Sequence, residues 1–122
     1  MQELEIFTYD GSGYNPTMHF DSWRVAFLNY AEHFDTINKL ERHMLTDEVF
    51  VLLNGQAVLL IGEKGQACHM ESGKIYNVKK GVWHAIKVTP DAKVLIVENH
   101  NTCRENTQYM PFDSSISTKI IL

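Results

Sequence analysis

The chain has 122 residues, of which 44% are apolar and 21% charged, so it is long enough for one domain with its own core and is not typical of a disordered or fibrous protein. Its net charge is −4 and its longest basic cluster is the pair Lys79-Lys80, which argues against a nucleic-acid partner. The apolar runs are strand-sized, which argues against a membrane-spanning helix, and the acidic N-terminus lacks a signal-peptide pattern. We therefore expect a cytoplasmic protein in which Cys68 and Cys103 are free thiols.

The first third of the chain is predicted to contain two strands. Leu4 to Tyr9 suggests a short edge strand, and residues 10–16, with their glycines and proline, suggest a loop. Trp23 to Tyr30 is rich in β-formers with apolar residues at both parities, which predicts a strand that is partly covered on both faces. Residues 31–40 are interpreted as a connection into the next strand.

The strongest local signal is an Asn-Gly pair between two aliphatic runs. Val49 to Leu53 and Gln56 to Ile61 flank Asn54-Gly55, and this pair favours a type I′ turn between paired antiparallel strands. Further short strands are predicted over 66–70, 74–78, 82–88 and 93–98. Six or more short strands at this spacing predict an all-β sandwich or barrel. After Asn99 the chain becomes polar apart from two apolar patches, which need cover from the core or from a partner subunit.

Four side chains in the middle of the chain form a candidate site. Glu41 and His43 are two residues apart on a predicted strand, so they point to the same side, about 6 to 7 Å apart along the backbone. Glu48 and His84 each share a parity with apolar neighbours, which predicts that both face the interior. An unpaired buried charge costs several kcal/mol or shifts its pKa until it is neutral. One divalent cation would satisfy all four groups.

The chemistry of these groups indicates which metals they would bind. Two imidazoles with one or two carboxylates suit Fe(II), Mn(II), Ni(II) or Zn(II), with positions left open for water or substrate. His43, Glu48 and His84 would form the arrangement of two histidines and one carboxylate that is found in many non-haem iron sites.

The spacing of these residues resembles the two sequence motifs of the cupin superfamily. The matching residues are His43, Glu48 and Gly55 in the first motif, and Gly73, Gly81 and His84 in the second. The resemblance covers about residues 41–98 of a single domain spanning 1–122. It implies a double-stranded β-helix, or jelly-roll barrel.

The chain departs from the cupin pattern at four positions. Glu41 replaces the first histidine, Lys79 the proline, Val88 the terminal asparagine and Asp35 the opening glycine. By resemblance, His43, Glu48 and His84 are metal ligands. Glu41 inherits only the place of a ligand, so it is a fourth ligand, a hydrogen-bond acceptor beside the metal, or a catalytic general base.

The resemblance also implies a function. It points to a metal-dependent enzyme acting on a small molecule, such as a sugar derivative or small carboxylic acid, by isomerase, epimerase, lyase or dioxygenase chemistry. Phe50, Lys39 and Ile86 are expected to line the substrate cavity. The alternatives are a non-catalytic module that binds a sugar or metabolite, and a structural dimer with a vestigial site. A homodimer is expected because single-domain cupins commonly dimerise through outer sheet faces.

Overall fold

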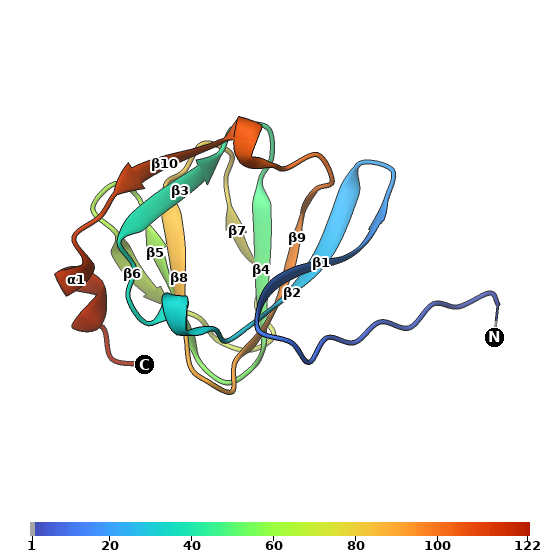
Figure 1. Cartoon of the computed structure of the whole chain (residues 1–122), viewed down its shortest axis with the longest axis horizontal. Helices are drawn as coiled ribbons and strands as arrows, with labels where there is room; N and C mark the ends of the chain where they lie inside the picture. Colours follow the sequence, from blue (N-terminus) through green and yellow to red (C-terminus); the bar gives the residue numbers. More distant parts are fainter. Residues whose placement is uncertain (1) are drawn as a thin grey trace.

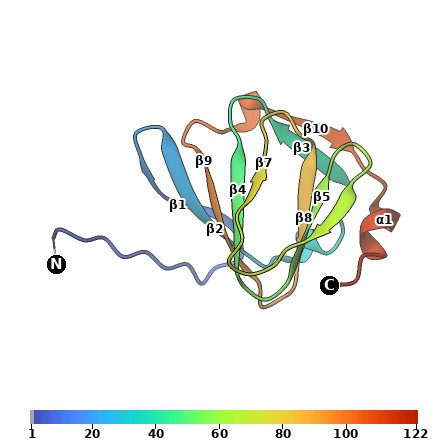
Figure 2. The same cartoon turned by 180° about the vertical axis from the view of Figure 1, so that it is seen from behind.

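The computed structural model describes residues 2–122 and consists almost entirely of β-strands. Its elements, in chain order, are β1 (Gly13–Phe20), β2 (Trp23–Asn29), η1 (Glu32–Phe34), β3 (Lys39–His43), β4 (Glu48–Asn54), β5 (Ala57–Ile61), β6 (Gln66–His69), β7 (Tyr76–Val78), β8 (His84–Val88), β9 (Lys93–Asn99), η2 (Arg104–Asn106), β10 (Thr107–Pro111) and α1 (Ser114–Thr118). The strands form two five-stranded antiparallel sheets, with the order β1-β2-β9-β4-β7 in sheet A and β10-β3-β8-β5-β6 in sheet B. Figures 1 and 2 view the molecule from opposite sides, and both show the two sheets facing each other. The predicted all-β jelly-roll barrel is confirmed.

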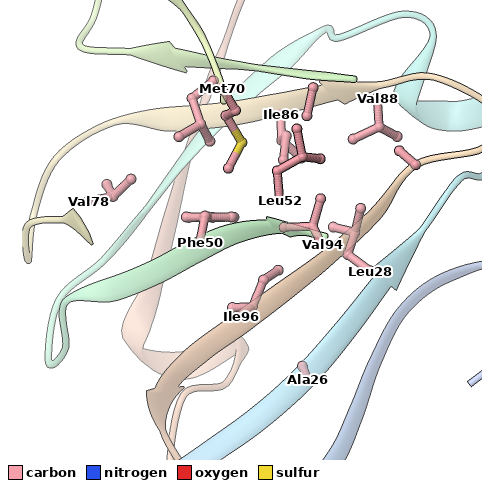
Figure 3. Packing of buried hydrophobic residues seen from close by; sticks show 13 residues of the cluster. Ala26, Leu28, Phe50, Leu52, Met70, Val78, Ile86, Val88, Val94 and Ile96 are labelled. Carbon is pink, nitrogen blue, oxygen red and sulfur yellow. The ribbon is translucent and has the colours of Figure 1, made fainter. Parts of the chain in front are cut away.

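The alternation of side chains along the strands places the core between the sheets. In β9 every second residue is buried, because successive side chains of a strand point to opposite faces. Phe50, Ile86 and Ile96 come from three strands of the two sheets and pack together in this core (Figure 3). β5 has four consecutive buried residues, which shows that sheet B is covered on both of its faces.

The predicted start of the sheet is wrong in position. Leu4 to Tyr9 is not a strand, and β1 lies partly in the stretch that was expected to be a loop. Pro16 is tolerated there because β1 is an edge strand that pairs only with β2. The register shifts next to it, between Pro16 and Met18. The residues before β1 instead project away from the body on the side of sheet A (Figures 1 and 2).

The predicted hairpin at Asn54-Gly55 is also wrong, and the pair does not form a type I′ turn, because Asn54 still belongs to β4 and only Gly55 of the two has a positive φ. β4 pairs with β7 and β9 in sheet A, whereas β5 pairs with β6 and β8 in sheet B. Both sides of β4 are already occupied, so β5 has no edge of that strand to pair with. Gly55 has a φ of 72°, and Asn54 donates a hydrogen bond to the carbonyl oxygen of Asp91 in another turn. Residues 54–56 therefore carry the chain from sheet A to sheet B through a bend at Gly55.

The C-terminal segment covers the outer face of sheet B. β10 pairs with β3 at the edge of the sheet, and the segment that follows packs Phe112 and Ile120 against a buried cluster that contains Leu40 and Leu60. The C-terminal tail, which was predicted to need cover from the core or a partner, thus packs apolar residues against sheet B of the same chain. No helix within residues 2–122 is long and apolar enough to cross a membrane.

Candidate metal centre

Three strands bring the four predicted site residues together between the sheets. β3 supplies Glu41 and His43, β8 supplies His84, and β4 supplies Glu48 from the opposite sheet. Glu41 and His84 are directly opposite each other in the pairing of β3 with β8. His43, Glu48 and His84 are buried, whereas Glu41 is half-buried.

Both imidazoles contact the same carboxylate oxygen. His43 Nε2 lies 3.0 Å from Glu48 Oε1, and His84 Nε2 lies 2.9 Å from that atom. The two rings approach each other with centroids 5.3 Å apart. The edge of the Phe50 ring completes the wall beside His84. Two ring nitrogens and a carboxylate oxygen therefore converge inside the barrel.

The hydrogen bonds of the two Nδ1 atoms determine whether the Nε2 atoms carry a proton. His84 Nδ1 lies 2.9 Å from the carbonyl oxygen of Val82, which can only accept, so Nδ1 carries a proton. His43 Nδ1 lies 3.0 Å from Thr107 Oγ1, and that hydroxyl donates its own proton to the carbonyl of Cys103. His43 Nδ1 must therefore also be a donor. In the neutral form, each Nε2 then has a lone pair facing Glu48, and only a second proton or a cation makes this contact favourable.

The electrostatics of the cluster agree with this requirement for positive charge. Burial disfavours the ionised carboxyl of Glu48, but the hydrogen bonds from His43 and His84 outweigh burial and lower its pKa to about 2. Burial also opposes protonation of the imidazoles, and their hydrogen bonds to Glu48 outweigh it and raise the pKa of both histidines. Glu48 is thus held as an anion, and its charge favours positive charge at the two imidazole Nε2 atoms that contact it.

A second buried cluster, which the sequence analysis did not include in the site, lies beside the first. Glu98 of β9 is 5% exposed, and its Oε1 accepts hydrogen bonds from the hydroxyl of Tyr14 and from Arg24 Nη2. Its Oε2 lies 3.9 Å from His43 Nε2 and has no hydrogen-bond partner among the described residues. Burial and the nearby charge of Glu48 raise the pKa of Glu98.

These groups surround a cavity of about 840 Å³ inside the barrel. This volume is within the range of about 300–1,000 Å³ that is typical of small-molecule sites. Phe50, Ile86 and Lys39, which were predicted to line a substrate cavity, all lie along its wall. Phe50 and Ile86 are buried and apolar, whereas Lys39 is exposed and its ammonium lies 4.7 Å from the centroid of the Tyr109 ring. The cavity thus combines an apolar wall with charged groups.

Comparisons with known proteins bear on the fold. No protein-family model matches the sequence, and no curated protein matches it. Pac13 from Streptomyces is described as a unique nucleoside dehydratase and has also been solved with uridine. One of its structures with uridine is 10% identical to this chain with a TM-score of 0.68, and the match covers 92% of this chain and 89% of that chain. A cupin-2 domain protein from Shewanella frigidimarina is 18% identical with a TM-score of 0.60, over 75% and 85% of the two chains. The chain has the cupin fold.

Another solved structure with this fold contains a metal. The Fe(II) form of HppE is 18% identical with a TM-score of 0.55, over 70% of this chain and 50% of that chain. At such identities, the likeness establishes the fold of this chain.

The residues at this site fit a divalent cation. Two sets of side chains place potential ligand atoms within 4.8 Å of one another: Glu41 with His43 and His84, and His43 with Glu48 and Glu98. Three carboxylates and one guanidinium, that of Arg24, surround the two imidazoles. The donor set therefore suits a cation, because nitrogen and carboxylate ligands are the set that Fe(II), Mn(II), Ni(II) and Zn(II) accept.

Proposed function

We propose that this cupin is a metal-dependent enzyme that acts on a small oxygen-bearing molecule, such as a sugar derivative or a small carboxylic acid. The observation that carries the proposal is the convergence of two imidazole Nε2 atoms on Glu48 while both Nδ1 atoms are committed as donors. His43, Glu48 and His84 would hold the cation. A bound divalent metal supplies polarisation of a substrate oxygen or, if it is iron, activation of dioxygen.

Glu41 is proposed to move a proton in this reaction. It lines the cavity next to His84, its cross-strand neighbour in sheet B, and no side-chain hydrogen bond holds its carboxylate among residues 2–122. Its half-buried position keeps the carboxylate within reach of a substrate in the cavity. A carboxylate so placed can take a proton from a carbon or hydroxyl next to a polarised oxygen, which is the step shared by isomerases, epimerases and lyases.

The substrate class is supported by the cavity. Its volume suits a sugar-sized or nucleoside-sized molecule, and charged groups, including Lys39 and Arg104, line it together with the apolar wall. The fold-level likeness to a nucleoside dehydratase is compatible with a polyhydroxylated substrate. The exposed free thiols of Cys68 and Cys103 support a reducing compartment such as the cytoplasm.

Metal analysis tests this proposal. Protein purified without a chelator or a metal-affinity tag is expected to carry stoichiometric divalent metal, which His43→Ala and His84→Ala lose. His69→Ala is the matched control, because His69 is exposed on β6 and does not line the cavity. Absence of metal from the wild type after reconstitution would refute the proposal.

Turnover assays then separate an enzyme from a binding module. The enzyme is expected to turn over a member of a panel of sugars, nucleosides and keto acids. Glu41→Gln is expected to abolish turnover while keeping the metal. Bound metal without turnover across the panel would instead identify a protein that only binds its ligand.

We also propose a homodimer formed through the outer face of sheet A. Six apolar residues lie on this face in two cross-strand rows, namely Val25, Val97 and Val49, and Phe27, Leu95 and Val51. All six are only half-buried, and no segment within residues 2–122 covers them as the C-terminal segment covers sheet B.

The N-terminal arm, residues 2–10, supports a second copy as the cover of this face. Lys93 and Asn29 hold the carbonyl oxygen of Tyr9 at the base of the arm. Beyond that point the arm projects on the side of sheet A (Figures 1 and 2), with Ile6 82% exposed and Leu4 54% exposed. An anchored arm with exposed apolar side chains is suited to lie across a second copy docked on the same side.

A further inference from the structure

Glu98 lies outside both cupin motifs, yet it is among the most deeply buried charged residues of the chain. It is at the inward parity of β9, shared with the buried Val94 and Ile96, and the residue is 5% exposed. A carboxylate at such a position is retained only where partners satisfy its oxygens, because desolvation of an unpaired charge costs several kcal/mol.

Only one of its two oxygens has such partners. Oε1 accepts hydrogen bonds from the Tyr14 hydroxyl and from Arg24 Nη2, the latter at 2.6 Å. Arg24 is in turn fixed by donating to the backbone oxygens of His100 and Thr102. Oε2 is buried and accepts no hydrogen bond from any described residue. In native proteins a buried acceptor of this kind is paired with a bound water, an ion or a ligand atom.

The position of Oε2 identifies the kind of ligand. Oε2 lies 3.9 Å from His43 Nε2, and ligand atoms of His43, Glu48 and Glu98 all lie within 4.8 Å of one another. The carboxylates of Glu48 and Glu98 repel each other unless a cation lies between them. The neutral imidazole of His43 does not supply that positive charge, because its only proton is on Nδ1, which donates to Thr107. A substrate hydroxyl could satisfy Oε2 alone but would leave this repulsion in place.

We propose that Glu98 is a further metal ligand of this cupin, bound through Oε2, and that Tyr14 and Arg24 act as positioning residues that hold Oε1 and so aim Oε2 at the metal. This inference rests on the proposed function, because it requires that His43 and Glu48 hold a cation. It adds a ligand from β9 that the cupin motifs do not supply, and it makes the β1–β2 hairpin part of the metal site.

Metal affinity, measured by chelator competition with Mn²⁺ and Co²⁺, tests the proposal. Glu98→Gln keeps the shape and a carbonyl acceptor for Tyr14 and Arg24 but removes the charge. We expect its affinity to fall at least tenfold and the visible absorption bands of bound Co²⁺ to change, since those bands report the ligand set. Glu71→Gln, at an exposed carboxylate, is the matched control and should leave both readouts unchanged.

Tyr14→Phe provides a second variant that removes a single hydroxyl and leaves the ion pair with Arg24 in place. It should weaken metal binding by less than Glu98→Gln does, in a protein with wild-type circular dichroism. Equal affinity and an identical Co²⁺ spectrum in the wild type and both variants would show that Glu98 only pairs with Arg24. A wild type that binds neither metal overturns the proposed function and this inference together, whereas binding that is insensitive to Glu98 overturns the inference alone.

Discussion

At the scale of single residues, Thr107 shows how the fold orients His43, which we propose as a metal ligand. Its hydroxyl accepts from His43 Nδ1 and donates to the carbonyl oxygen of Cys103. This pair of hydrogen bonds fixes both the tautomer and the orientation of the His43 ring. Thr107 belongs to β10, so the C-terminal strand contributes to the site although it supplies no ligand.

Replacement of Thr107 by valine is therefore expected to weaken metal binding without removing it. Loss of such an outer hydrogen bond typically lowers metal affinity about 10- to 100-fold. Chelator competition measures the change, and Thr118→Val in α1, away from the cavity, is the control. An unchanged affinity would mean that the ring of His43 is held by packing alone.

The sequence predicted part of this site for a physical reason. His43, Glu48 and His84 are recognisable because fixed strand and turn lengths impose fixed spacing on them. Glu98 carries a weaker signal, an acid at the inward parity of an aliphatic strand. Its partners Arg24 and Tyr14 are 74 and 84 residues away in the chain, and only the pairing of β1, β2 and β9 brings them together.

At the scale of secondary-structure elements, the contact between the turn after β5 and the C-terminal segment links two distant parts of the chain. Gly65 has a φ of 64°, and a Cβ placed on it would lie 2.5 Å from the Phe112 ring. That ring packs against the buried cluster on the outer face of sheet B. The absence of a side chain at Gly65 therefore allows the C-terminal segment to lie flat on the sheet.

Gly65→Ala is expected to lower the free energy of unfolding by roughly 2–4 kcal/mol, which combines left-handed backbone strain with displacement of a packed ring. Gly62→Ala is a sharp control, because Gly62 has a φ of 84° and nothing within 4 Å of the added Cβ, so only the backbone strain of roughly 1–2 kcal/mol applies. Urea denaturation measures both. Equal losses in the two variants would rule out the steric contact with Phe112.

The elements that the sequence predicted best are those fixed by local signals. Strand positions from β2 to β9 follow from short runs of β-formers between turn residues, but the partner of each strand does not. Asn54-Gly55 is a favourable hairpin sequence, yet β4 cannot pair with β5 because β9 and β7 occupy both of its edges. The choice of partner strands depends on the whole fold and not on the local sequence. β1 was missed because Pro16 is a loop signal in sequence and is harmless on an edge strand.

At the scale of the whole molecule, the two outer sheet faces differ. Sheet B is covered by the C-terminal segment, whereas the rows Val25-Val97-Val49 and Phe27-Leu95-Val51 give sheet A a half-buried apolar outer face. Leu95 lies at the centre of this face, on β9 between β2 and β4. A two-fold axis through the face would pair each row with its copy and let each N-terminal arm reach its partner.

Leu95→Glu is therefore expected to convert a dimer into a folded monomer. Placing a charge in the centre of the apolar interface should raise the dimer dissociation constant roughly 100-fold or more. Sedimentation velocity over a concentration series measures this constant, and circular dichroism checks the fold. Ile121→Glu is the matched control, because Ile121 is 85% exposed in the C-terminal segment over the other sheet.

Deletion of residues 2–8 should weaken the dimer by removing the arm while leaving the sheet contact. A wild type that sediments as a monomer at every concentration would contradict the proposed dimer, and a dimer that survives Leu95→Glu would place the interface on another surface.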